Sequence, residues 1–151
     1  MTEAPDSDVA PEPTASTDAV PVTACTVATL RQLPAVRVLA KSFADHTPGA
    51  RFHALLVDCD SLDEVGSLDR FAAGAGFVHP TALGIDADEL ARLRTACDPD
   101  ELCAVLRPRL MHWLVTSSET SGPVLHLDPS VLVLGPIVAP VLAGLVQHSL
   151  V

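Results

Sequence analysis

Almost unbroken apolar runs alternate along this chain with segments of helical periodicity, and that alternation is what most restricts its fold. The runs that we expect to be strands are 22–28, 51–58, a brief one around 77–79, 124–127, and a short one at 131–134. Strands that are apolar throughout bury both of their faces, which is typical of parallel sheets covered by helices. We therefore predict an α/β fold, a Rossmann-like parallel sheet with helices on both faces.

Four helices are expected between and after these strands. They are 35–46, opened by Pro34, then 86–96, 98–115 and 137–147, while 62–71 is either a short helix or a loop. Asp86 and Asp98 stand where side chains cap the first turn of a helix. Pro108 predicts a kink in the third helix or a break into two helices. The inward face of that helix is expected to hold Leu102, Val105, Leu106, Leu110 and Trp113.

Charge is unevenly distributed along the 151 residues, whose net charge is -10. Residues 1–20 are predicted to be a disordered acidic tail rich in Pro and Ala, because such a composition buries too little apolar surface to fold. Residues 21–151 are then expected to form one domain. Outside the first 21 residues, 14 acids face 9 bases. That balance lacks the basic stripe of a nucleic-acid binder, so no nucleic-acid partner is expected.

Cysteine usage and the apolar C-terminal segment bear on the compartment. The cysteines at 25, 59, 97 and 103 form no C-x-x-C pair, which predicts reduced thiols in a cytoplasmic protein, and no signal peptide is recognised.

Residues 131–151 carry no charge, and 14 of the 21 are Val, Leu, Ile or Ala. That length could span a bilayer. Its prolines, glycines and missing basic flank make a membrane partner unexpected. A C-terminal anchor stays as an alternative.

Carboxylates follow two of the predicted strands. Asp58 and Asp60 come after 51–58, and Asp128 comes after 124–127. The carboxyl ends of parallel strands share one edge, so these acids could line a common crevice, one bonded to a base or ribose and another close to a metal. Alternatively, Asp58 and Asp60 are solvated or capping residues and Asp128 begins an Asp-Pro turn. His126 points the same way as Asp128, either as half of a metal-binding pair or as a partly buried, hydrogen-bonded histidine.

Three segments occur in an order that is typical of one enzyme family. They are Leu39-Ala-Lys-Ser-Phe43 within 28–58, Glu101-Leu-Cys103 with Arg107-Pro108 within 98–114, and Leu127-Asp-Pro-Ser-Val-Leu-Val-Leu-Gly-Pro-Ile137. Together they resemble bacterial, in particular actinobacterial, GT-A type glycosyltransferases. The likeness extends over about residues 22–151. It implies a partial GT-A domain that binds a nucleoside-diphosphate sugar.

The resemblance also implies roles for particular residues. The base and ribose would lie against Thr29 and either Asp58 or Asp60. Asp128 and Ser130 occupy the two acidic positions of the metal-binding D-x-D, which holds Mg²⁺ or Mn²⁺ against the diphosphate. The cation is needed because the departing nucleoside diphosphate gains negative charge in the transition state.

The sequence departs from the family pattern at three points. Ser130 replaces the second acid of D-x-D, and Arg107, expected at the phosphates, replaces the usual lysine before Pro108. The family normally continues into an acceptor-binding half, so the domain is expected to be incomplete at its C-terminus, and a second chain that completes it is one expected partner. The sugar, the acceptor and the catalytic residues stay unassigned. The alternative is a non-catalytic truncated remnant or interaction module of the same fold.

Overall fold

The computed structural model describes residues 22–117 and 122–147. The strands are β1 (Thr23–Ala28), β2 (Arg51–Leu56), β3 (Ala75–Val78) and β4 (Val124–His126), and the α-helices are α1 (Leu33–His46), α2 (Ala87–Ala96), α3 (Pro99–Thr116) and α4 (Val138–Gln147). Short 3-10 helices follow three of the strands or their loops: η1 (Leu30–Gln32), η2 (Leu62–Glu64) and η3 (Pro80–Leu83). The predicted tail, 1–20, lies outside the described residues.

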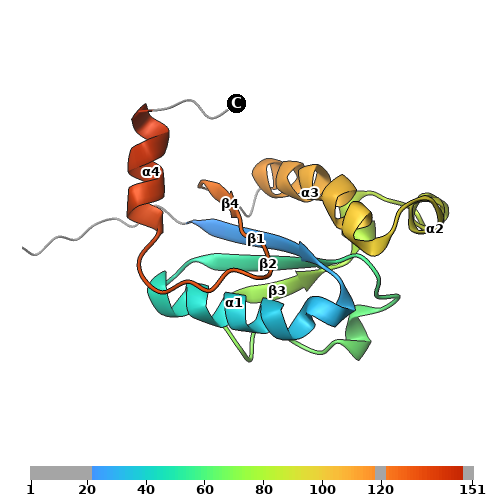
Figure 1. Ribbon diagram of the computed structural model, residues 1–151, viewed down its shortest axis with the longest axis horizontal. Helices are drawn as coiled ribbons and strands as arrows, with labels where there is room; N and C mark the ends of the chain where they lie inside the picture. Colours follow the sequence, from blue (N-terminus) through green and yellow to red (C-terminus); the bar gives the residue numbers. More distant parts are fainter. Residues whose placement is uncertain (1–21, 118–121, 148–151) are drawn as a thin grey trace, which may run out of the picture.

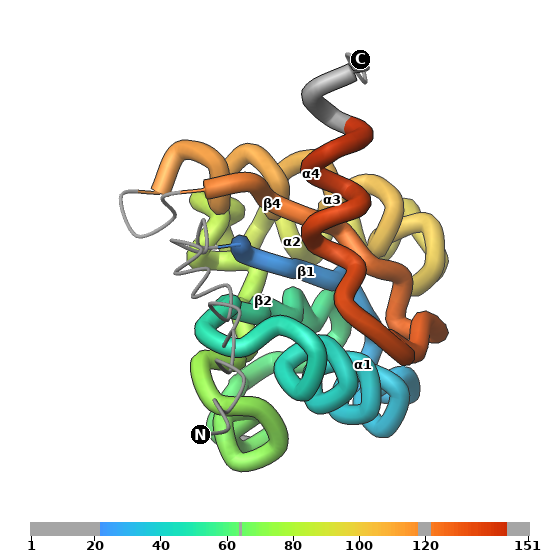
Figure 2. The backbone as a smooth tube through the Cα atoms, turned by 90° about the vertical axis from the view of Figure 1, so that its left-hand side faces the viewer, coloured from blue at the N-terminus to red at the C-terminus, as the bar shows by residue number. Residues whose placement is uncertain are grey.

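The four strands form one parallel sheet in the order β3-β2-β1-β4. Helix α1 covers one face, while α2 and α3 lie over the other (Figure 1). This arrangement confirms the predicted Rossmann-like α/β fold with helices on both faces. The chain builds outward from β1 to β2 and β3, and it then crosses back to place β4 on the opposite side of β1. Figure 2 shows β1 between β2 and β4.

All six residues of strand β1 are buried, which explains why the sequence of this strand does not alternate between polar and apolar residues. Ala24 and Ala28 contribute to the core on the α1 side, together with Phe43. Cys25 and Val27 contribute to the core on the α3 side. A strand with a core on each face has no room for a polar side, as expected for a central parallel strand.

The predicted strand at 131–134 is wrong, because this segment pairs with no strand within 22–117 and 122–147. It runs across α1 instead. Val133 is buried in the core on that side, and its main-chain N–H donates to Ser42 Oγ at 3.2 Å. The apolar run thus reflects packing against a helix, and Leu132 and Leu134 beside it stay exposed.

Both predicted helix caps are confirmed. Asp86 accepts a hydrogen bond from the main-chain N–H of Glu89 at the start of α2. Asp98 accepts from the N–H groups of Asp100 and Glu101, and the Glu101 carboxylate accepts from the Asp98 N–H in return. This reciprocal capping box satisfies amide donors that the helix itself leaves unpaired.

Helix α3 continues through Pro108 as a single helix, so the alternative of a break into two helices is wrong. Leu106 and Leu110, on either side of the proline, are both fully buried against the sheet and hold the helix in place. Val105 was expected to face inward but is exposed, and Leu114 occupies the buried face instead. The proline therefore lies on the outer side of a helix whose apolar stripe remains continuous.

Helix α4 confirms the predicted helix in the apolar C-terminal segment. It is 10 residues long. Across 22–117 and 122–147, no helix combines the length and the apolar character needed to cross a membrane.

Candidate functional site

The carboxyl ends of β1 and β2 are joined by a small hydrogen-bond network. Thr29, the residue after β1, is only 3% exposed, and its main-chain N–H and hydroxyl both donate to Gln32 Oε1 at 3.0 and 3.2 Å. Asp58, just beyond β2, accepts the main-chain N–H of Leu30 through Oδ1 at 2.7 Å. Asp58 therefore acts as a capping residue. Within the described part of the chain, no contact engages its Oδ2.

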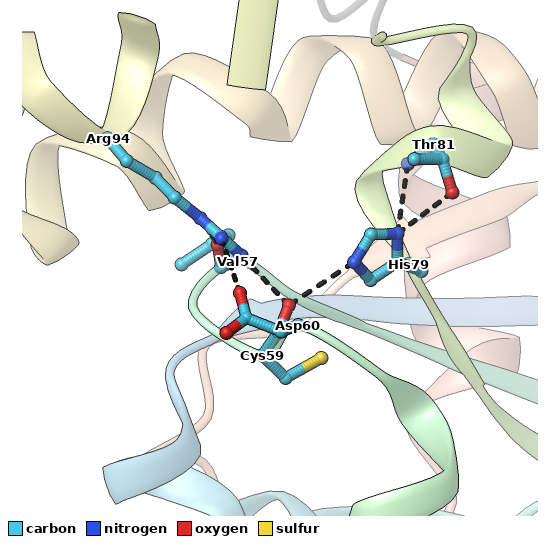
Figure 3. Close-up of polar contacts among 6 residues, drawn as sticks. All are labelled: Val57, Cys59, Asp60, His79, Thr81 and Arg94. Atoms are coloured by element: carbon cyan, nitrogen blue, oxygen red, sulfur yellow. Dashed lines mark hydrogen bonds and ion pairs between the residues drawn. The ribbon is translucent and has the colours of Figure 1, made fainter. Parts of the chain in front are cut away.

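Asp60 lies away from this network and pairs with α2 (Figure 3). Its Oδ1 accepts from Arg94 Nη1 at 2.8 Å, and its side chain is 89% exposed. The same guanidinium donates from Nε to the carbonyl of Val57 at 3.1 Å and from Nη2 to the carbonyl of Cys59 at 2.8 Å. Arg94 thus fastens α2 to the loop that follows β2. No motif in the sequence singled Arg94 out, because the partners of an arginine on a helix surface depend on tertiary packing.

His79, which follows β3, contacts the same loop after β2 that Arg94 binds (Figure 3). Its Nε2 lies 3.2 Å from the Cys59 carbonyl, and its Nδ1 accepts the main-chain N–H of Thr81 at 3.3 Å. We assign the proton to Nε2 from this network, since Nδ1 must be unprotonated to accept. His79 and Arg94 therefore both donate to the Cys59 carbonyl, and both hold the loop after β2 in place.

Asp128 follows β4 and opens an exposed turn. Its Oδ1 accepts the N–H of Ser130 at 2.9 Å and the Ser130 hydroxyl at 2.6 Å, while Pro129 between them is buried. The Asp-Pro turn anticipated as an alternative is therefore present. Hydrogen bonds from the Ser130 hydroxyl and N–H hold the pKa of Asp128 below its ordinary value, and the Arg107 guanidinium acts in the same direction.

His126 lies beneath this turn on the α3 side of the sheet. It is in register with Cys25, whose side chain belongs to the core under α3. Its Nε2 is buried and has no hydrogen-bond partner among the described residues, so the expected hydrogen bond is missing at this atom. Burial lowers the pKa of His126, Arg107 lowers it further, and Asp128 opposes them. Arg107 thus acts electrostatically on both members of the H-x-D pair.

The described residues bring together few side chains that could bind a metal ion. Among the residues that the structure describes, no group of three or more His, Cys, Asp or Glu side chains could enclose a metal ion. Asp128 and Ser130 are bonded to one another, and Asp128 Oδ2 has no described partner. Mg²⁺ in nucleotide sites commonly takes one or two carboxylates and completes its shell with phosphate oxygens and water. The described residues would thus offer a cation one free carboxylate oxygen at this turn, and the rest of its shell would have to come from elsewhere.

The four cysteines are free thiols in the structure, and three of them are buried. Burial raises the pKa of Cys25 to about 12 and that of Cys103 to about 11. The pKa of Cys59 is raised as well, chiefly by burial and then by the Asp58 carboxylate. Because the thiolate is the reactive form, none of these three is prepared to act as a nucleophile.

The effect of Ser130 on the pKa of Asp128 can be measured directly. In Ser130→Ala, the loss of the hydroxyl donor is expected to move the pKa of Asp128 upward, toward its ordinary value, because that hydrogen bond is the largest cause of the lowering. Carboxyl-detected NMR titration reads the change. The control is Ser67→Ala. The Ser67 hydroxyl accepts a hydrogen bond from the main-chain N–H of Asp69, and its loss should leave the Asp128 titration unchanged. An unaltered Asp128 pKa in Ser130→Ala would show that the turn is open in solution.

No protein-family model matches the chain, and no curated protein matches it.

Proposed function

We propose that this chain is a glycosyltransferase-like domain that binds a nucleoside-diphosphate sugar, with a divalent cation, at the carboxyl ends of β1 and β4. The observation that carries the proposal is the reversal of strand order between these two strands. Open α/β sheets bind ligands in the crevice at such a switch point. Asp128 follows one of the two strands and Thr29 follows the other.

The charges at this edge suit a diphosphate held by a cation. Asp128 is a carboxylate at neutral pH, since its pKa lies below the ordinary value, and its Oδ2 remains available within the described structure. Arg107 is exposed on α3 and supplies a permanent positive charge acting on Asp128. A bound Mg²⁺ or Mn²⁺ would neutralise charge that develops on the departing nucleoside diphosphate. Ser130 would then support Asp128 by hydrogen bonding.

The nucleoside half of the ligand is assigned chiefly to Asp58. Its Oδ1 is engaged by Leu30, but its exposed position and open Oδ2 suit a hydrogen bond from a ribose hydroxyl. Thr29 is buried and bonded to Gln32, so its part is to shape the edge of the sheet. Asp60 would need to leave Arg94 before it could reach a ligand, which makes it the weaker nucleotide contact.

Calorimetric titration of the full chain with UDP and GDP, with and without Mn²⁺, tests this proposal. We expect binding that requires Mn²⁺ and that weakens at least about 10-fold in Asp128→Ala, as is usual when a metal ligand or its support is removed. Asp88→Ala removes an exposed acid from the first turn of α2 and serves as the matched control. A folded chain that binds neither nucleotide would overturn the donor-site assignment.

A non-catalytic binding module of the same fold is the second candidate. It is favoured by Ser130, which stands where a second carboxylate would bind a hard cation more strongly. Nucleotide binding without hydrolysis or transfer of a nucleotide-sugar would support this candidate. Transfer that appears only on addition of another polypeptide would instead indicate a second chain that supplies the acceptor side.

A further inference from the structure

Two arginines flank one aromatic ring on the outer side of α1. The Cζ atom of Arg37 lies 4.8 Å from the centroid of the Phe71 ring, and that of Arg70 lies 5.2 Å from it. Cation–π contact attracts each guanidinium to the ring. It supplies no anionic partner, and two like charges at one ring repel each other.

The Arg37 guanidinium lacks hydrogen-bond acceptors among the described residues. Its Nε is buried and has no hydrogen-bond partner among the described residues, and within them it forms no ion pair. Among the described residues Arg70 likewise forms no ion pair, whereas Lys41 pairs with Asp45 at 2.9 Å on the same helix as Arg37. Because this Nε is buried, a ligand beside Arg37 would pair with its Nη groups, whose N–H donors point in a fixed fork.

A groove of about 370 Å³ opens beside Arg37. Its walls include Phe71 from the loop before β3, Val38 from α1 and Leu132 from the segment that crosses α1. Val38 is 55% exposed and Leu132 is 53% exposed. The groove therefore has apolar walls beside the Arg37 guanidinium, and the Lys41–Asp45 ion pair and Ser42 also line it. None of its lining residues belongs to the site proposed at the strand ends.

We propose that this groove binds a small carboxylic acid whose carboxylate pairs with Arg37 and whose short apolar chain lies on Val38, Phe71 and Leu132. A guanidinium presents a planar fork of N–H donors that matches the two oxygens of a carboxylate. The apolar walls favour a ligand with a hydrocarbon body over a bare ion. The ligand class follows from the Arg37 guanidinium, which has no anionic partner among the described residues, lying beside apolar side chains.

Titration of the ¹⁵N-labelled full chain with hexanoate and with acetate tests the proposal, because the two probes share a charge and differ only in the apolar chain. Saturable amide shifts at Val38 and Phe71 are expected with hexanoate, at a Kd at least about 10-fold below that of acetate, since each buried methylene adds favourable transfer free energy. Equal affinity for the two probes, or inorganic phosphate binding as tightly as hexanoate, would overturn the proposal.

Variants separate the guanidinium from the apolar walls. Arg37→Gln should weaken hexanoate binding about 10-fold or more, whereas Arg92→Gln, an exposed arginine on α2, should leave it unchanged. Leu132→Asn alters an exposed side chain, so the fold is kept and only the preference for hexanoate over acetate should fall. An unchanged hexanoate affinity in Arg37→Gln, or an unchanged preference for hexanoate over acetate in Leu132→Asn, would contradict the assignment.

Discussion

Replacing Phe43 by Ala is expected to lower the free energy of unfolding by about 3–5 kcal/mol, the usual cost of truncating a buried phenylalanine. Phe43 is 1% exposed and links α1 to β2 through Phe52, with ring centroids 6.1 Å apart. Removing the ring leaves a cavity between the helix and the sheet that the fully buried neighbours Leu39 and Ala40 cannot fill without moving the helix. Urea unfolding followed by circular dichroism measures the change.

Val38→Ala provides the control for Phe43→Ala, because it truncates an exposed apolar residue on the same helix. Its effect is expected to stay within about 0.5 kcal/mol, as for most surface substitutions. A loss below about 1 kcal/mol in Phe43→Ala would mean that α1 does not pack on the sheet through this ring.

Replacing Arg94 by Met is expected to destabilise the protein by about 2 kcal/mol, since the carbonyls of Val57 and Cys59 lose charged donors. Arg94→Lys should recover only part of this loss, because an ammonium cannot reproduce the fork that reaches two carbonyls and Asp60 together. Denaturant midpoints of the variants, with unchanged slopes, give the comparison.

Asp60→Asn distinguishes the ion pair from the carbonyl contacts of Arg94. The Asp60 side chain is 89% exposed, and exposed pairs contribute about 0–1 kcal/mol. A loss in Asp60→Asn as large as that in Arg94→Met would show that the carboxylate, and not the loop carbonyls, is the important partner.

The fold could be predicted because burial on both faces leaves a direct trace in the sequence. All six residues of β1 are buried, as are the last three of β2, and the capping box of Asp98 and Glu101 marks the start of α3. The segment 131–134 shows the limit of this reasoning. An extended apolar segment that crosses a helix has the same composition as a strand, and only its hydrogen bonds tell the two apart.

The candidate site was less predictable for a related reason. The sequence placed Asp58 and Asp128 at strand ends correctly, but it could not reveal which of their oxygens the chain itself would use. Nor could it pair Asp60 with Arg94, since the two residues are 34 positions apart and meet only through the packing of α2. Local spacing predicts which edge a side chain reaches, whereas tertiary contacts decide whether it is available there.

The pairing of β1 with β4 has a consequence for how the chain is made. The register joins Thr23 to Val124, so one side of β1 meets its partner only after about one hundred further residues have been synthesised. Until then, one edge of β1 stays unpaired, and an unpaired strand edge is a template for pairing with other chains. Closure of so long a loop is slow compared with helix formation. The second edge of β1 is therefore covered only after α2 and α3, which lie between β1 and β4 in the sequence, have been synthesised.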